Sequence, residues 1–300
     1  GRQRGNVDGF RVDVTPDLRV ATTGSGNTLG GMIGQHVSGT ATDIAVVFKG
    51  GSLSATGADS TLGGVIGRSD AGNTIRNVSV TTDRGGTHLS GNGTIGGIVG
   101  TKLGKGDNTF DLENIAVDKV VVSASGERDG AVLGGIAGTL ENAAVRNAAF
   151  AASLKASGDK ATIGGIVGRA ADSILYEVEA QPDIAAAVRT GQTAAGGIAG
   201  SLTSSDRDNE FRFGGRIPFY YGIYEANVHT KEINVRGADL NADLFVGGIA
   251  GRIDQASIYF SQSSAPIAVH GGKTATVGGI AGASDGMIVS VQARSGVKAD

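Results

Sequence analysis

The sequence predicts an all-β fold, a right-handed parallel β-helix (solenoid) of about eight coils with three short strands per coil. Three observations predict it: a glycine-rich block recurs along the chain, two short alternating segments separate successive blocks, and the composition suits a repetitive β-structure. Glycine contributes 52 of 300 residues without a Gly-X-Y register, which excludes a collagen-like triple helix. Hydrophobic residues make up 40% of the chain, enough to fill a core, so we do not expect disorder.

The recurrent block consists of an apolar residue, two glycines, two further apolar residues and a final glycine. Its eight copies span residues 29–34, 62–67, 95–100, 133–138, 163–168, 195–200, 246–251 and 277–282. The steps between successive blocks are 33, 33, 38, 30, 32, 51 and 31 residues. Eight copies at nearly one period indicate a solenoid in which each coil repeats one unit.

Each unit also contains two weaker β-like segments. An alternating segment follows the block, as in 44–48, 75–80 and 145–150, and a shorter one precedes the next block, as in 52–55 and 267–269. Three strands in about 32 residues suit one coil of a β-helix, whereas a propeller blade needs four strands and about 40–45 residues. The left-handed hexapeptide helix needs a six-residue rhythm that is missing, and a β-roll-like variant is the second choice.

The glycines of the block indicate a tight bend that is repeated in every coil. Glycine reaches positive φ easily and lets two backbones approach closely. We expect the apolar residue after the glycine pair, such as Val65 or Ile98, to face the core. The residue before the pair, such as Leu62, faces inward only if the chain bends at the glycines; strict alternation would turn it outward.

The combination of a Gly-Gly-Ile-Val-Gly block, a short turn and an Ile-x-Asn-Val segment resembles the GLUG repeat of bacterial cell-surface and secreted proteins. The repeat region of some immunoglobulin A peptidases and adhesin-like proteins is of this kind. The resemblance covers roughly residues 28 to 295 and implies an extracellular, non-catalytic repeat region. The third position of the Ile-x-Asn-Val segment is asparagine in some units and another residue in others, so we do not expect an uninterrupted asparagine ladder. The asparagines are Asn77, Asn114, Asn147 and Asn227, and the replacements are Asp43, Glu177 and Phe260.

The chain divides into an N-terminal edge or partial coil, residues 1–27, and a single repeat domain, residues 28–300. Insertions near 101–111 and 201–222 account for the two long steps. Both follow the glycine block, so we expect them on one edge of the rod, three coils or roughly 14 Å apart. Two loops at this spacing would bound a shallow groove. Neither end of the chain resembles a cap, and we expect more protein or an oligomeric contact on at least the C-terminal side.

The longer insertion is rich in aromatic residues with interleaved arginines, which are good contact anchors for proteins and sugars. Its candidate ligand- or partner-binding residues are Arg212, Arg216, Phe219, Tyr220, Tyr221 and Tyr224. The alternative is that these aromatic residues fold down into a local core that pins a long loop.

The chemistry of catalysis is poorly represented in the sequence. We expect the acidic residues of the insertions to be solvated, namely Asp107, Asp111, Asp206, Asp208 and Glu210. The histidines, His36, His88, His229 and His270, are scattered and the chain has no cysteine, so we expect no metal site and no cofactor. A threonine stands before the block in five units, and Val132, Ala194 and Phe245 interrupt this row. An interrupted row is better explained by β-propensity than by ice binding.

These observations favour a non-catalytic structural or adhesive repeat segment of a larger extracellular bacterial surface protein. The alternative is a glycan-binding or glycan-cleaving β-helix module, similar to a tailspike, that uses the groove between the two insertions. Expected partners are a host-surface or neighbouring-cell protein or glycan, and further domains of the same parent chain. The net charge of −3 and the lack of a basic run argue against nucleic acid, and no apolar stretch is long enough for direct membrane insertion.

Overall fold

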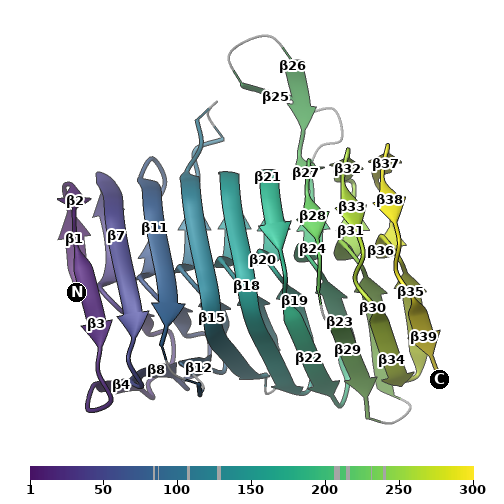
Figure 1. Ribbon diagram of the computed structural model, residues 1–300, viewed down its shortest axis with the longest axis horizontal. Helices are drawn as coiled ribbons and strands as arrows, with labels where there is room; N and C mark the ends of the chain where they lie inside the picture. Colours follow the sequence, from purple (N-terminus) through teal and green to yellow (C-terminus); the bar gives the residue numbers. More distant parts are fainter. Residues whose placement is uncertain are drawn as a thin grey trace.

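The structure is a computed structural model that describes residues 1–300 except 84, 87, 107–108, 127–129, 206–209, 214–216, 231 and 239–240. At 210–213 and 217–219 it describes the backbone only. The fold is all-β, and the predicted parallel β-helix is confirmed (Figure 1). Its coils lie side by side from the N-terminus at one end of the stack to the C-terminus at the other.

Each coil contributes to three sheets, A, B and C. Sheet A contains β1 (Arg2–Arg4), β6 (Ile33–Ser38), β10 (Ile66–Ser69), β14 (Val99–Leu103), β17 (Ala137–Glu141), β20 (Val167–Ala171), β24 (Ala199–Thr203), β31 (Ala250–Asp254) and β36 (Ala281–Ser284). Sheet C contains β5 (Thr28–Gly30), β9 (Thr61–Gly63), β13 (Thr94–Gly96), β16 (Ala131–Gly134), β19 (Ala161–Gly164), β23 (Gly191–Gly196), β30 (Ala242–Gly247) and β35 (Thr274–Gly278).

Sheet B has two legs, which the strands β15 (Leu112–Gly126) and β18 (Ala144–Gly158) cross without a break. The first leg contains β2 (Val7–Asp8), β3 (Arg11–Val14), β7 (Thr40–Phe48), β11 (Thr74–Thr82), β21 (Ile174–Ala180), β27 (Gly222–Tyr224), β28 (Asn227–Val228), β32 (Ser257–Tyr259), β33 (Gln262–Ser263), β37 (Met287–Val289) and β38 (Gln292–Ala293). The second leg contains β4 (Arg19–Thr22), β8 (Ser52–Ala55), β12 (Leu89–Gly91), β22 (Asp183–Val188), β29 (Glu232–Gly237), β34 (Ile267–Gly271) and β39 (Val297–Ala299). A separate antiparallel hairpin pairs β25 (Glu210–Phe213) with β26 (Ile217–Tyr220).

The glycine block is the corner between sheets C and A, so the chain does bend at the glycine pair. In the third block, β13 ends at Gly96 and β14 begins at Val99. Ile95 before the corner, Ile98 in it and Val99 after it are all at most 1% exposed. Three apolar residues of one six-residue block therefore enter the same core, which strict alternation along a single strand would forbid.

Close backbone approach explains the glycines of this corner. Their φ angles are not positive, so the left-handed conformation is not the reason for glycine here. A Cβ on Gly64 would lie 2.1 Å from the carbonyl oxygen of Gly97 in the next coil. One on Gly63 would lie 1.8 Å from the carbonyl oxygen of Ile66 in its own coil. Any larger residue would push apart either two coils or two sheets.

Positive φ occurs instead at a bend in the first leg of sheet B, at the asparagine position of the repeat. The φ angles are 53° at Asn77, 57° at Asn114 and 51° at Asn147, and asparagine tolerates this region better than most residues. The side chains form a short ladder: the Asn114 amide donates to Asn77 at 3.0 Å, and that of Asn147 donates to Asn114 at 2.7 Å. Asp43 accepts from Asn77 at 2.9 Å and completes four rungs.

The asparagine ladder stops at Glu177, so the expectation of an interrupted ladder is confirmed. The assignment of Asn227 to the ladder is wrong. Tyr176 pairs with Tyr224, and the next residue in that coil, Glu225, has the positive φ of 52°. The insertion that precedes this coil obscured the register in the sequence.

Candidate functional site

Both insertions emerge at the turn from sheet A to sheet B, on one edge of the rod, as predicted; the β25–β26 hairpin projects from this edge (Figure 1). The predicted bounds need a correction, because strands β14 and β24 continue to Leu103 and Thr203 before the insertions begin. The 38-residue step also contains extra residues elsewhere, since four residues separate Gly126 from Ala131 where two separate their partners Gly158 and Ala161, and the register shifts between Asp118 and Val121. The spacing of the glycine blocks shows only the total number of extra residues in this step and not where they lie.

Tyr221 and Tyr224, two of the six predicted binding residues, are buried at 8% and 6% exposure. They form a small cluster with Ala144 and Ile174, against which Phe110 of the first insertion also packs. The Tyr224 hydroxyl donates to the Tyr220 carbonyl at 2.8 Å. For these two tyrosines the structure matches the alternative of a local core, which here joins the two insertions.

The other four candidates are distributed differently. Tyr220 is half-buried at the base of the hairpin. Arg216 lies outside the described residues, and the side chains of Arg212 and Phe219 do as well. The acidic residues Asp107, Asp206 and Asp208 are also outside the described part of the chain, as is the side chain of Glu210.

An aromatic and charged column follows the outer face of sheet B beneath the insertions. The rings of Tyr224 and Tyr259 stack with centroids 4.9 Å apart and an interplanar angle of 13°. Burial, and then the neighbouring Tyr259, raises the pKa of Tyr224 above its usual range. At the other end of the column, the Arg146 guanidinium lies 4.6 Å from the centre of the Phe110 ring. Sequence reasoning missed this column because its members are one coil apart.

Beside this column lies an acidic pocket of about 430 Å³. Glu177 and Glu225 occupy adjacent rungs at the positive-φ bend, and Glu179 and the 61% exposed ring of Phe260 also line the pocket. Burial of Tyr176, reinforced by Glu177 and Glu225, raises the pKa of its hydroxyl. Two carboxylates on neighbouring coils beside an exposed aromatic ring are groups of the kind that contact sugars in proteins. No pattern in the linear sequence brings these three side chains together.

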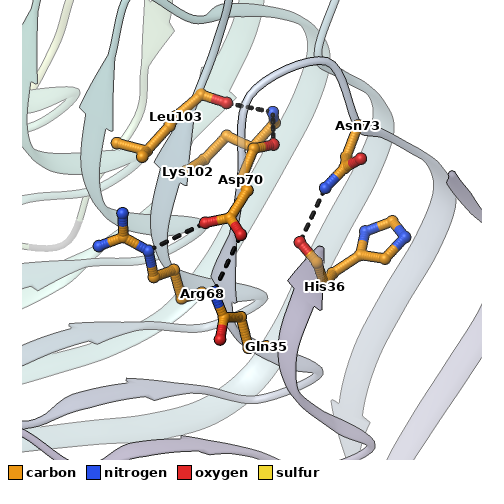
Figure 2. Close-up of polar contacts among 7 residues, drawn as sticks. All are labelled: Gln35, His36, Arg68, Asp70, Asn73, Lys102 and Leu103. Atoms are coloured by element: carbon orange, nitrogen blue, oxygen red, sulfur yellow. Dashed lines mark hydrogen bonds and ion pairs between the residues drawn. The ribbon is translucent and has the colours of Figure 1, made fainter. Parts of the chain in front are cut away.

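A buried polar cluster lies at the turn from sheet A to sheet B in the N-terminal coils (Figure 2). Lys102 is completely buried and its ammonium group lies 2.9 Å from the carboxylate of Asp111. Asp111 also accepts a hydrogen bond from the Ala144 backbone N–H at 3.0 Å. The expectation that Asp111 is solvated is therefore wrong, because its carboxylate ties the first insertion to the core. Around this pair, Asp70 accepts hydrogen bonds from Gln35 at 2.9 Å and from Arg68 at 3.1 Å.

His36 stands two rungs from Lys102 in the same inward-facing column and is completely buried. Its backbone carbonyl accepts a hydrogen bond from Asn73 at 2.7 Å, whereas its ring nitrogens form no hydrogen bond of good geometry with the described residues (Figure 2). Burial lowers the pKa of His36 below its ordinary value of 6.5, and Lys102 lowers it further, while Asp70 acts in the opposite direction. The folded protein therefore favours a neutral imidazole at this position.

We predict that acidification destabilises the protein through His36. The pKa of His36 is lower in the folded than in the unfolded state, so its contribution to the free energy of unfolding is fully present above about pH 6.5. As the pH drops below that value, the free energy of unfolding falls by at most about 1.4 kcal/mol per pH unit. The measurement is the free energy of unfolding in urea at pH 7.5 and 5.5 for the wild type and His36→Leu. The variant should lose less stability than the wild type. The exposed His229→Gln serves as control, and an equal loss in all three proteins would contradict the prediction.

Comparison with protein-family models gives no match, and comparisons with curated proteins and with solved structures give none either. Within the described ranges, no group of three or more histidine, cysteine, aspartate or glutamate side chains is placed to hold a metal ion. Among the same residues, no helix has the length and apolar character needed to cross a membrane.

Proposed function

We propose that this chain is a non-catalytic structural and adhesive segment of a larger extracellular bacterial surface protein. The observation that carries the proposal is the parallel register that runs from β1 to β39, in which each coil is hydrogen-bonded to the next through three sheets. A rod of this kind holds surface groups at a fixed spacing of about 4.8 Å per coil. The resemblance of its blocks to GLUG repeats supports the extracellular bacterial setting.

The partners in this proposal are a protein or glycan on a host or neighbouring cell, and further domains of the same parent chain. The projecting insertion edge is one contact surface, with Tyr220 at the base of its hairpin and the exposed Phe260 ring nearby. The local core around Tyr221 and Tyr224 supports this role, because a hairpin anchored to the rod can contact a partner with little loss of conformational entropy.

Adhesion of coated beads tests the proposal. Beads that carry the folded chain should remain on layers of host cells or of bacteria under flow, whereas beads coated with an unrelated protein of similar charge should wash away. Beads coated with the heat-unfolded chain separate the effect of the fold from that of composition. Equal retention of all three kinds of bead would contradict an adhesive role.

The acidic pocket favours a second candidate, a glycan-binding or glycan-cleaving module. Glu177 and Glu225 lie on adjacent rungs, whose backbones are about 4.8 Å apart, and retaining glycosidases place their two carboxyl groups about 5–5.5 Å apart. Release of reducing ends from bacterial and host polysaccharides measures this activity directly. Turnover that disappears in Glu177→Gln and in Glu225→Gln would replace the non-catalytic proposal, whereas binding without turnover would support it.

A further inference from the structure

A second groove, of about 450 Å³, lies on the outside of the corner between sheets C and A. It extends over four successive coils, from Val132 on β16 to Phe245 on β30, or roughly 14 Å along the rod axis. Its place in the fold is separate from the insertion edge and from the acidic pocket, which lie along sheet B.

The floor of this groove follows from the interrupted threonine row. Thr162, Ala194 and Phe245 occupy successive rungs of the same outward-facing column. The short Ala194 side chain leaves a depression between a threonine on one side and an aromatic ring on the other. The residues that interrupt the row, Val132, Ala194 and Phe245, all line the groove.

The walls of the groove carry positive charge. Lys160, Arg169 and Arg252 line it, and no described aspartate or glutamate does. Neither Lys160 nor Arg169 forms an ion pair with a described residue. In a protein of net charge −3, three cations gathered without a lining carboxylate are a local feature rather than a general property of the surface.

The cations are spaced along the rod in a way that suits a chain-like anion. Arg169 and Arg252 belong to one column of sheet A with Ser201 between them, so they are two rungs or roughly 10 Å apart. The Arg252 guanidinium lies 5.8 Å from the centre of the Phe245 ring and donates to Gln192 at 3.1 Å. A fixed arginine beside an aromatic ring can hold a carboxylate while the ring packs against the apolar face of a sugar.

We propose that this groove binds an acidic polysaccharide, with Arg169 and Arg252 contacting anionic groups on two sugar units, Phe245 packing against the unit that Arg252 holds, and the depression at Ala194 accommodating the chain between them. The inference deepens the proposed adhesive function and rests on it, because it names the class of glycan that the rod would hold. Single-stranded nucleic acid is the less suitable ligand, since its binding sites need several stacking aromatic rings along a longer basic track, and this groove offers one ring.

Direct binding of purified polymers to the full chain tests this proposal. The probes are a polygalacturonate oligomer, the same oligomer with its carboxyl groups reduced, and single-stranded oligothymidylate. We expect the acidic oligomer to bind, its affinity to fall at high salt, and the reduced oligomer to bind at least about tenfold more weakly. Preferential binding of the oligothymidylate, or equal binding of the acidic and reduced oligomers, would overturn the assignment of the ligand.

Matched variants test the site. The double variant Arg169→Gln with Arg252→Gln should lower affinity by about 10- to 100-fold, while Arg236→Gln, an exposed arginine on sheet B, should change it by less than about twofold. Ala194→Thr adds a second threonine beside Thr162 without changing charge and should also weaken binding, because it fills the floor. These are surface positions apart from Ala194, and circular dichroism verifies that each variant is folded.

Binding that survives the double variant and Ala194→Thr would overturn the groove as the site. Absence of binding to any acidic oligomer would overturn the ligand class as well. Neither result would decide the adhesive proposal, because the bead assay measures adhesion of the whole folded chain to cells, to which other surfaces of the protein also contribute. Conversely, if the beads fail to adhere but the chain still binds the acidic oligomer, the groove is supported as a binding site and the adhesive function is contradicted.

Discussion

Replacement of Asp111 by alanine is expected to lower the free energy of unfolding by about 3–5 kcal/mol, because it leaves the Lys102 charge buried without its carboxylate. The two side chains are 0% and 7% exposed, so water cannot readily replace the missing partner. The same substitution removes the acceptor of the Ala144 backbone N–H. Urea unfolding followed by circular dichroism measures the change.

Two controls separate the buried charge from simple loss of packing. The double variant Lys102→Met with Asp111→Leu removes both charges and should be much closer to the wild type than Asp111→Ala. Arg68→Ala breaks the more exposed pair with Asp70, whose side chains are 42% and 27% exposed, and should cost less than about 1 kcal/mol. A cost for Asp111→Ala no larger than that for Arg68→Ala would show that the buried pair does not hold the first insertion in place.

The fold was predictable because every coil repeats the same physical problem. A strand whose neighbours above and below are copies of itself needs residues that stack, and the glycine blocks recorded the period directly. The direction of each side chain was less predictable. Leu62, Val65 and Ile66 are all buried because the corner breaks the two-residue alternation, and the sequence alone left both orientations of Leu62 open.

The buried cluster escaped prediction for a different reason. Lys102 and Asp111 stand among glycines and polar residues that read as a solvent-exposed turn. The repeat nevertheless contains a signal: in the next four coils of sheet A, the residues in the column of Lys102 are Leu140, Ala170, Leu202 and Ile253, all of them buried. A charged residue followed by four apolar residues in its column predicts a buried ion pair, but only after the coils are aligned strand by strand.

The surface sites were predictable in part. The insertion edge follows from the lengths of the repeat units, whereas the acidic pocket and the basic groove depend on residues one to three coils apart that come together only in the stack. For the groove, the interruptions of the threonine row at Val132, Ala194 and Phe245 were visible in the sequence. Their meaning required the register, which brings them beside Arg169 and Arg252.

The second large effect is expected at the corner, where Gly97→Ala should lower the free energy of unfolding by about 3 kcal/mol or more. A Cβ at this position would lie 2.0 Å from the carbonyl oxygen of Gly135 and 3.0 Å from Val117 Cγ2. The nearest obstacle is backbone, which cannot rotate away as a side chain can. Because the same corner recurs in every coil, displacement of one coil requires displacement of the next. Thermal and urea unfolding measure the loss.

Two further glycines show whether this cost arises from the coil above. Gly85→Ala places a Cβ with nothing within 4 Å and should change stability by less than about 1 kcal/mol. Gly279 occupies the same place as Gly97 in the last block, where the nearest atom to a new Cβ is Ala293 Cβ at 2.9 Å and no carbonyl oxygen is within 4 Å. Gly279→Ala should therefore fall between the other two variants. If it costs as much as Gly97→Ala, the strain belongs to the corner of a single coil and not to the stacking of neighbouring coils.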